Sequence, residues 1–326
     1  MAALCAVPAL ADAGLMIDGK LTDAVPAIVN NRTYLPLRSV FEALGAYVEW
    51  DGATQTVFAQ KRFDDISMTV NADVYKLNGE EMPMEAPVII EDGRTLVPVR
   101  AAGDALGCKV EWDQDSRTVI LTTPKSEHDF LDIYLDFWGK NDAGSVVLAG
   151  RAAYPEIDNE SGDSVIEAFN DYLAAQTEQM CDDVLLNKID AASESGGGYM
   201  LERRFDVVCD SGGIVSVLSI DSLFGGGAYP EMKASATSFD LNNGRILTVE
   251  DVLGEEFSAV KCRVLELFAD KINAAPQDFY TDAAQHISDA VTQSGWYIAE
   301  DGVHFFVDPG ILAPPEKGIC EIVIKR

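Results

Sequence analysis

The side chains that most often carry enzyme chemistry are sparse and scattered in this chain of 326 residues. Its three histidines, His128, His286 and His304, are far apart, and none belongs to a His-Glu-x-x-His metal motif. The sequence also contains no Gly-x-Ser-x-Gly nucleophile motif and no phosphate-binding Gly-x-x-x-x-Gly-Lys-Ser/Thr motif. We therefore expect no catalytic residue, no metal site and no cofactor.

Two short segments could instead bind a ligand. The glycine run at 225–227 could let a ligand approach the backbone, because glycine has no Cβ; the alternative is a bulged or irregular strand end. A second segment rich in glycine and proline, 308–316, could leave further backbone groups available. The candidate ligand-binding residues are Gly225, Gly226, Gly227, Tyr229, Pro230, Asp308 and Pro309.

Charge indicates what kind of partner to expect. The formal net charge is −30, of which residues 1–124 carry −8 and residues 125–326 carry −22. Such a field repels nucleic acid and anionic lipid and speeds encounter with cationic proteins. We expect no nucleic-acid partner; a basic protein is the partner that such a charge suits, although acidity that serves solubility alone is the more common cause.

The elements that would position any site begin with an internal repeat. Residues 32–60 align with residues 94–122 without a gap and with 13 identities in 29 positions. Both copies contain an Arg-Thr-x-x-Pro-x-Arg segment, an Ala-Leu-Gly segment and a Val-Glu-Trp-Asp segment. This pattern predicts a duplicated ββαββ repeat, with copies at 14–60 and 64–122 that form two similar subdomains.

Turn residues define each copy. Asn30-Asn31 and Asp92-Gly93 tolerate positive φ and predict tight hairpins before the Arg-Thr segments. A helix of about two turns should follow each proline and end at Gly45 or Gly107. A closing hairpin should then carry the Val-Glu-Trp-Asp segment.

These segments resemble the copper amine oxidase-like N-terminal domain of bacterial envelope proteins, over about residues 14–122. The resemblance implies the fold and an envelope setting. It does not imply oxidase activity, because that family's three histidine ligands and quinone-forming tyrosine belong to another domain, and the repeats here contain no histidine.

The repeated tryptophans and arginines allow two interpretations each. Trp50 and Trp112 could stack on sugars, but packing against the short helices is the favoured prediction. Arg38 and Arg100 are predicted to form repeated ion pairs with the acidic residues of the Val-Glu-Trp-Asp segments.

After a linker at 123–139, the pattern changes to an α+β domain in which helices pack on an antiparallel sheet. The expected helices cover 164–189, 255–274 and 282–294. The expected strands cover 144–155, 199–208, 213–223, 234–241, 296–299, 304–307 and 319–324, and the first should end at its proline. The four cysteines of this region could form up to two disulfides in a pairing that stays open: Cys181, Cys209, Cys262 and Cys320.

Residues 140–326 resemble the extracytoplasmic domain shared by the anti-sigma-V factor and the non-catalytic part of certain peptidoglycan deacetylases. The segments that carry the resemblance are Tyr154–Ile157, Phe224–Pro230, Phe239–Arg245 and Phe306–Ala313. The sequence departs from the family at Tyr229, where a histidine is usual, and at Gly310, where an aromatic residue is usual. The resemblance implies a lysozyme-type partner.

Residues 1–13 are predicted to be part of a signal peptide, because an apolar stretch ends in the small-x-small segment Ala11-Asp12-Ala13. No later apolar run is long enough to predict a membrane span. We therefore expect a secreted, non-enzymatic binding protein of the cell envelope that holds a lysozyme-type protein or a wall component. The alternatives are an accessory protein of peptidoglycan hydrolysis or deacetylation with an unrecognised active site, and a structural spacer.

Overall fold

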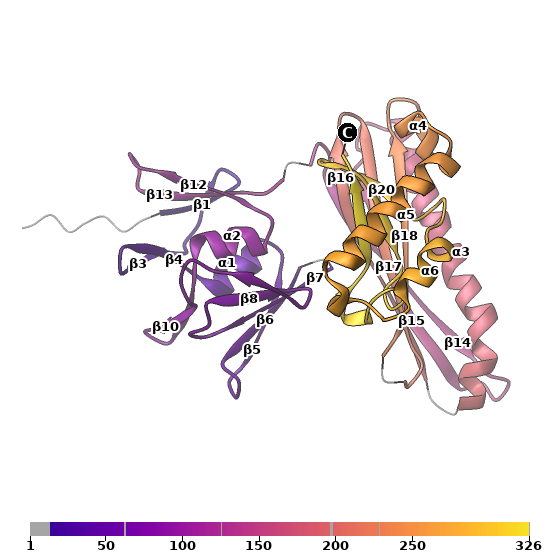
Figure 1. Cartoon of the computed structure of the whole chain (residues 1–326), viewed down its shortest axis with the longest axis horizontal. Coiled ribbons are helices and arrows are strands. Elements are labelled where there is room, and N and C mark those ends of the chain that lie inside the picture. Colours follow the sequence, from indigo (N-terminus) through magenta and orange to yellow (C-terminus); the bar gives the residue numbers. More distant parts are fainter. Residues whose placement is uncertain (1–13, 62, 125, 196–197, 228, 326) are drawn as a thin grey trace, which may run out of the picture. The chain divides into compact units, whose positions relative to one another are not determined.

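The computed structural model describes residues 14–61, 63–124, 126–195, 198–227 and 229–325. The chain divides into two compact units, with unit 1 ending at Lys125 and unit 2 beginning at Ser126 (Figure 1). Both units combine helices with mainly antiparallel sheets, so the predicted α+β class is confirmed. The predicted signal segment, residues 1–13, lies outside the described residues.

The described residues of unit 1 form three sheets and two short helices. The first copy supplies β1 Gly14–Ile17, β2 Lys20–Leu21, β3 Ala27–Val29, β4 Arg32–Pro36, α1 Leu37–Ala43, β5 Tyr47–Asp51 and β6 Thr56–Lys61. The second supplies β7 Asp64–Thr69, β8 Val74–Leu77, β9 Glu80–Pro83, β10 Ile89–Glu91, β11 Arg94–Pro98, α2 Val99–Ala105, β12 Lys109–Asp113 and β13 Thr118–Thr122. The sheet orders are β12-β13-β1-β2, β10-β11-β4-β3 and β5-β6-β7-β8-β9.

Each of these sheets contains strands from both copies. The repeated Arg-Thr-x-x-Pro strands, β4 and β11, pair antiparallel, and Leu35 lies opposite its repeat equivalent Val97. Strand β1 pairs with β13, and β6 pairs with β7. Apolar residues of both copies form one core cluster, which includes Phe41 and Ala102. The prediction of two subdomains is therefore wrong: each copy leaves an apolar face that only the other copy covers.

The turn chemistry of the repeat is as predicted. Asn30, Asn31, Asp92 and Gly93 all have positive φ and connect β3 to β4 and β10 to β11. Gly45 follows α1 with φ 83° and Gly107 follows α2 with φ 66°, the left-handed conformation that ends a helix at low cost in glycine.

The tryptophans and arginines differ from the prediction. Trp50 and Trp112 lie near the free ends of the closing hairpins and remain 38% and 45% exposed, so they are not core residues. The Arg38 guanidinium donates to Glu42 Oε1 over 3.1 Å and to the Val48 carbonyl over 2.8 Å. It ties the helix to β5 through these acceptors, and the predicted ion pair with the Val-Glu-Trp-Asp segment is wrong for Arg38.

Unit 2 contains two sheets and four α-helices within its described residues. The larger sheet has the order β14-β15-β16-β17-β18-β19, with β14 Phe130–Lys140, β15 Val146–Ile157, β16 Tyr199–Ser211, β17 Ile214–Phe224, β18 Glu231–Asp240 and β19 Arg245–Ile246. The smaller has the order β20-β21-β22, with β20 Trp296–Ala299, β21 Gly302–Val307 and β22 Cys320–Ile324. The α-helices are α3 Ser164–Ser195, α4 Val249–Leu253, α5 Phe257–Ala274 and α6 Ala283–Ala290; short 3-10 turns occupy η1 Pro276–Asp278 and η2 Pro315–Lys317.

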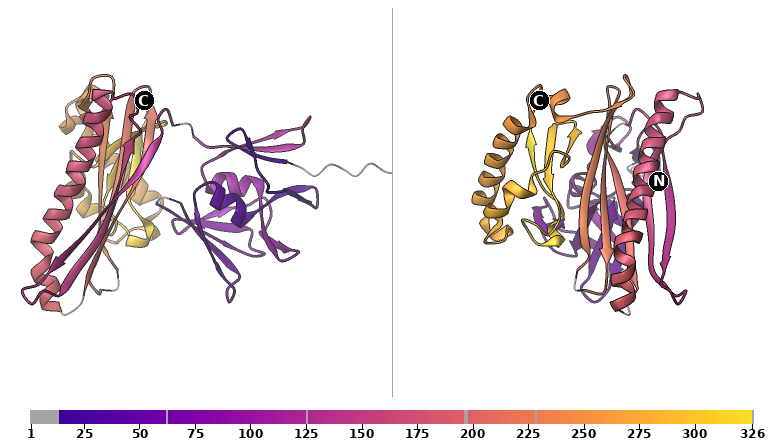
Figure 2. Two further views of the ribbon diagram at one scale, coloured as in Figure 1. Left: turned by 180° about the vertical axis from the view of Figure 1, so that it is seen from behind. Right: turned by 90° about the vertical axis from the view of Figure 1, so that its right-hand side faces the viewer.

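The elements of unit 2 form layers, which Figure 2 shows edge-on in its right-hand view: α5, the small sheet, the large sheet and α3. Phe169 and Leu173 of α3 pack on Val217 and Phe239 of the large sheet. Apolar residues of α5, among them Val264 and Phe268, pack on the small sheet. Helices thus cover the outer faces of two stacked sheets, whereas the sequence predicts helices on one antiparallel sheet.

Three local features of unit 2 differ from the prediction. Strand β14 occupies most of the segment predicted as a linker, 123–139. Strand β15 continues through Pro155 to Ile157, and its register with β14 is unbroken there. Helix α4 was not predicted, although Thr248 and Asp251 form a capping box at its start.

The cysteines do not form the bridges considered for unit 2. Cys181, Cys262 and Cys320 are free thiols, so no disulfide joins any two of the four cysteines. None of the helices in the described part of the chain is both long and apolar enough to cross a membrane.

Candidate functional site

The most prominent exposed apolar feature of unit 2 is a row of side chains across four neighbouring strands of the large sheet. Trp138 on β14 pairs with Ala149 on β15, Ala149 pairs with Met200 on β16, and Met200 pairs with Phe224 on β17. Residues paired in register point to the same face of a sheet. Trp138, Met200 and Phe224 are 62%, 65% and 44% exposed. We call these four residues the apolar row.

The apolar row points away from α3. A Cβ placed on Gly139 would lie 2.8 Å from Ile189 and 3.0 Å from Leu185 of α3, so Gly139 faces the helix. Trp138, its neighbour along the strand, therefore faces the opposite side.

The small sheet covers part of the face of the large sheet that carries the apolar row, at the other end of its strands. Strand β20 packs against β16, β17 and β18. The core cluster of α5 and the small sheet takes in Cys209, near the end of β16, and Ile214, at the start of β17. Met200 and Phe224 lie at the other ends of the same two strands, which leaves the apolar row exposed.

Polar side chains border the apolar row. On the same face, two residues further along each strand, Asp136 pairs with Arg151, and Arg151 pairs with Glu202. The Arg151 guanidinium donates to both Asp136 carboxylate oxygens over 2.7 and 3.1 Å, which lowers the pKa of Asp136. It also lies 5.6 Å from the centroid of the exposed Tyr134 ring. The face thus offers aromatic surface with a charged border, a composition typical of binding surfaces.

The predicted glycine loop begins directly after Phe224 and connects β17 to β18. A Cβ on Gly225 would lie 2.6 Å from the Tyr199 ring, so only glycine fits beside that ring. Gly226 has φ 87°, and Gly227 lies in open surroundings apart from the Tyr229 carbonyl at 3.6 Å from its Cβ position. The first two glycines therefore serve the loop's own conformation. Tyr229 is 63% exposed and Pro230 is half-buried.

The second predicted segment is mainly structural. Asp308 Oδ1 accepts a hydrogen bond from the backbone N–H of Ala234 over 2.8 Å. Asp308 therefore lies against β18, and its contact point there is only four residues after Pro230. Burial raises the pKa of Asp308. Pro309, Leu312 and Ala313 are buried, and these side chains do not offer surface to a ligand.

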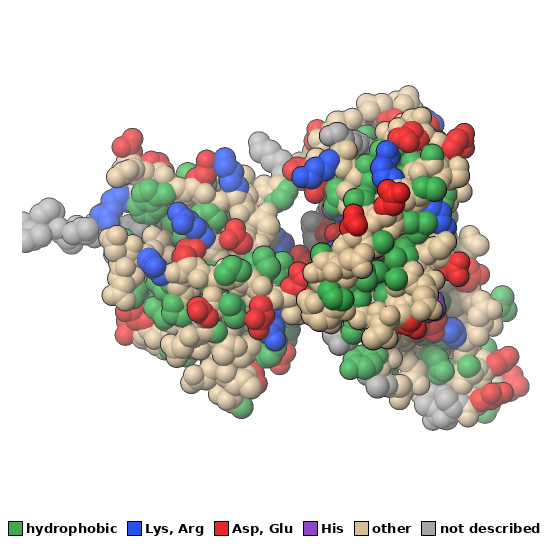
Figure 3. Space-filling view, viewed as in Figure 1, with side chains coloured by type: hydrophobic (Ala, Val, Ile, Leu, Met, Phe, Trp, Pro, Cys, Tyr) green, Lys and Arg blue, Asp and Glu red, His purple; other side chains and the backbone are tan. Residues whose placement is uncertain are grey.

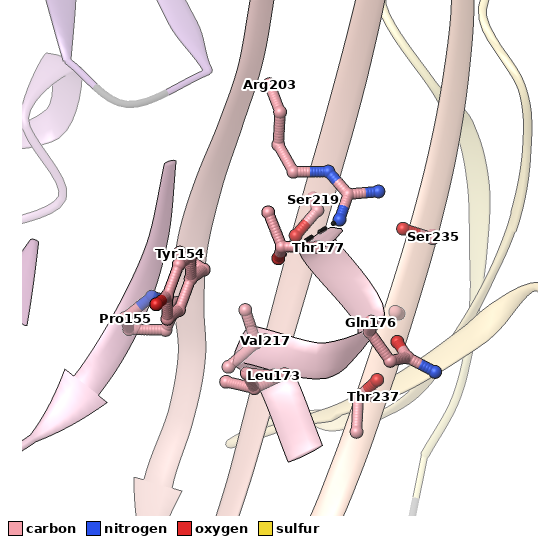
Figure 4. Close-up of a pocket in the computed structure, with 11 residues that line it drawn as sticks. Tyr154, Pro155, Leu173, Gln176, Thr177, Arg203, Val217, Ser219, Ser235 and Thr237 are labelled. Atoms are coloured by element: carbon pink, nitrogen blue, oxygen red, sulfur yellow. Dashed lines mark hydrogen bonds between the residues drawn. The ribbon is translucent and has the colours of Figure 1, made fainter. Parts of the chain in front are cut away.

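A second candidate is a small polar cleft between α3 and the large sheet, with a cavity volume of about 10 Å³, about enough for one water molecule (Figure 4). The buried Arg203 guanidinium donates to Asp221 over 2.5 and 2.9 Å and to Thr177 Oγ1 over 3.4 Å. Ser219, Ser235 and Thr237 also line the cleft. Because Asp221 neutralises Arg203 in a bidentate pair, the cleft offers hydroxyl groups more than free charge.

The nearby Cys181 is not set up as a nucleophile. Burial raises the pKa of its thiol to about 11, so the thiol is protonated at neutral pH.

A polar network around the buried His304 on the small sheet was not predicted from the sequence. The Tyr297 hydroxyl donates to Glu321 Oε2 over 2.6 Å and lies 3.2 Å from His304 Nδ1. His304 Nε2 lies 2.7 Å from Asp301 Oδ1. Tyr297, Asp301 and His304 belong to the β20–β21 hairpin, whereas Glu321 reaches them through the pairing of β22 with β21. Within the described residues, no group of three or more His, Cys, Asp or Glu side chains is arranged to hold a metal ion.

Comparison of the sequence with known protein families gives a match within unit 1. Residues 16–121 match the copper amine oxidase N-terminal domain. This confirms the first predicted resemblance. The match spans both copies of the repeat, so one copper amine oxidase N-terminal domain corresponds to the whole shared-core unit.

Solved structures similar to the chain include two members of one uncharacterised family. A DUF3298 family protein from Bacteroides fragilis is 17% identical, with a TM-score of 0.44, over 61% of this chain and 91% of that one. A DUF3298 family protein from Pseudomonas aeruginosa is 16% identical, with a TM-score of 0.42, over the same shares, 61% and 91%. No curated protein matches the chain. The resemblance of residues 140–326 to the anti-sigma-V factor domain stays a prediction.

Proposed function

We propose that this chain is a secreted, non-catalytic binding protein of the cell envelope, and that unit 2 binds a basic extracellular protein of lysozyme type. The observation that carries the proposal is the apolar row, an exposed aromatic surface in a strongly acidic unit. Scattered exposed apolar residues are ordinary, whereas aligned ones across four strands favour a partner surface. The net charge of −22 on residues 125–326 favours a basic partner.

Charge and apolar surface would have different tasks in such a complex. Acidic side chains are spread over the face shown in Figure 3, with exposed hydrophobic side chains between them. Long-range attraction speeds encounter and weakens with salt, whereas apolar burial slows dissociation and resists salt. The resemblance to a lysozyme-binding domain supports the same partner class. The glycine loop and Tyr229, which adjoin Phe224, extend the proposed contact surface.

The test is a titration of the full chain with lysozyme at physiological salt, with cytochrome c as a basic protein of unrelated fold. We expect saturable binding of lysozyme alone. Met200→Glu should weaken binding at least about tenfold, because it places a charge in the apolar row. Leu186→Glu is the matched control, since Leu186 is exposed on α3 and belongs to the other side of the sheet. Equal binding of both basic proteins, or equal loss in both variants, would leave only a nonspecific acidic surface.

A wall glycan is a second candidate ligand, and the exposed Trp50 and Trp112 rings favour it. Both occupy equivalent positions in the two copies, and exposed tryptophan rings can stack on sugar rings. Sedimentation of the chain with purified wall fragments, compared with the Trp50→Ala and Trp112→Ala variants, distinguishes this candidate from protein binding.

A further inference from the structure

One edge of the large sheet is open along a full strand. Strand β14 spans eleven residues, Phe130–Lys140, and its regular pairing with β15 is interrupted only between Gly139 and Lys140. In the described structure, β15 is the one strand paired with β14. In an antiparallel pair, alternate residues of an edge strand direct their backbone N–H and C=O groups outward.

The other edge of the same sheet is treated differently. Strand β19, at that edge, is only two residues long. The adjacent stretch of β18 is met by Asp308, whose carboxylate accepts the Ala234 N–H. Short edge strands and covering side chains are usual protections against unwanted strand pairing. Strand β14 is eleven residues long and contains no proline, and its single lysine is its last residue.

The exposed face of β14 alternates in chemistry. Tyr134 and Trp138 are exposed aromatic residues, and Asp132 and Asp136 are exposed acidic residues between and beside them. Asp136 is bound to Arg151, whereas no basic side chain of the described residues pairs with Asp132. A strand laid along β14 would meet aromatic and acidic side chains in turn.

The charge of the chain selects among partners. A second copy would bring a net charge of −30 to another of −30. Antiparallel pairing of two β14 strands would also place their aspartates near each other, and like charges across a strand pair are destabilising. A basic extended segment avoids both costs and gains the backbone hydrogen bonds.

We propose that the free edge of β14 accepts an extended, basic segment of a partner protein as an added strand. Lysine or arginine side chains of that segment would lie near Asp132, and its apolar side chains would lie against Tyr134 and Trp138. This deepens the proposed function, because it names how a basic partner attaches beside the apolar row.

The test uses the full chain and synthetic peptides of roughly nine residues in which lysine and valine take turns at every second position, with threonine at the positions between them, so that one face of the added strand carries both residue types. The unmodified peptide should bind saturably, and a peptide with glutamate in place of lysine should not. Two further peptides carry N-methyl groups on alternate residues, one on the odd set and one on the even set. One set should weaken binding at least about tenfold and the other much less, since only one edge of an added strand faces β14.

The protein variants separate charge from position. Asp132→Lys should weaken binding of the lysine peptide and allow the glutamate peptide to bind. Asp171→Lys, the same change at an exposed position of α3, should do neither. No binding of the unmodified peptide, equal effects of the two N-methyl sets, or equal effects of the two variants would overturn strand addition. Lysozyme binding without peptide binding would leave the proposed function standing, and the reverse result would leave strand addition standing.

Discussion

Leu35 and Val97 lie directly opposite each other in the pairing of β4 with β11, and both are fully buried. They are 62 residues apart and equivalent in the two copies of the repeat. A local twofold axis between them therefore relates the two antiparallel strands. Because β1 also pairs with β13 of the other copy, the copies complete each other's sheets. The repeat is therefore one folding unit made of two halves.

The first prediction concerns this shared core. Leu35→Ala should destabilise unit 1 by about 2–5 kcal/mol, because it removes a fully buried side chain at the junction. A fragment of residues 14–61 should fail to fold alone, whereas residues 14–124 should fold. Circular dichroism and chemical unfolding of the two fragments measure this. A cooperative transition in the shorter fragment would contradict the shared core.

The second prediction concerns the repeated tryptophans. Trp50→Ala and Trp112→Ala should each cost about 1 kcal/mol of stability, well below the 3–5 kcal/mol expected of a buried aromatic residue, because a large part of each ring is already in water. Phe41→Ala is the reference, since Phe41 is fully buried in the same unit. Thermal unfolding of the three variants compares them. Tryptophan variants as unstable as the Phe41 variant would mean that the rings are buried.

Much of the fold could be predicted from residues near each other in sequence. The Asn30-Asn31 and Asp92-Gly93 turns, and the glycines that end α1 and α2, act locally and lie where they were expected. The exchange of strands between copies could not be predicted this way, since the same turns fit two separate cores equally well. Trp50 was predicted to pack against the short helix because both copies retain it beside the closing hairpin, but it is 38% exposed.

The candidate site divides in the same way. The glycine loop was located correctly as a break between two strands, yet the reason for Gly225 is the Tyr199 ring, 26 residues earlier. The apolar row depends on the register of four strands, and a shift of one residue would turn each of its side chains to the other face. Strand β14 did carry a local signal, with Ile133, Leu135 and Phe137 facing one side, which was overlooked in favour of a linker.

The third prediction concerns the start of unit 2. A fragment of residues 126–326 should fold, and one of residues 140–326 should not fold stably. The shorter fragment loses β14 and the contacts of Ser126 and His128 with the buried Asp210 carboxylate, at 2.6–2.7 Å. Burial raises the pKa of Asp210, but the hydrogen bonds from Ser126 and His128 outweigh it and lower the pKa overall. Size-exclusion chromatography and chemical unfolding check the prediction. Equal stability of the two fragments would mean that β14 is dispensable.

The last prediction concerns pH and the network around His304. Burial alone would lower the pKa of His304, but its hydrogen bonds to Glu321 and Asp301 raise it overall. Burial alone would raise the pKa of Glu321, but His304 and Tyr297 lower it overall. Asp206, on the facing sheet, adds a further negative charge near Tyr297, whose own pKa is raised mainly by burial.

The sign follows from these directions. Because the pKa of His304 is higher in the folded state, its protonation stabilises the fold fully below the unfolded pKa of about 6.5. This stabilisation is lost as pH rises through the folded pKa. Because the pKa of Glu321 is lower in the folded state, its ionised form stabilises the fold above about pH 4.5. This stabilisation is lost as pH falls through the folded pKa. The network should therefore stabilise the small sheet most at mildly acidic pH, and raising the pH from about 6 to about 9 should weaken it.

His304→Gln should remove that alkaline loss and cost roughly 2 kcal/mol at about pH 6, because charge-assisted hydrogen bonds to two carboxylates disappear. Hydrogen–deuterium exchange of peptides from β20 to β22 in the full chain, measured across this pH range, reads the small sheet separately from unit 1. His286→Gln is the matched control, since His286 is exposed and lies 3.3 Å from Asp282. If the His304 and His286 variants keep the same pH dependence of exchange as the unchanged chain, the buried histidine does not carry a stabilising charge.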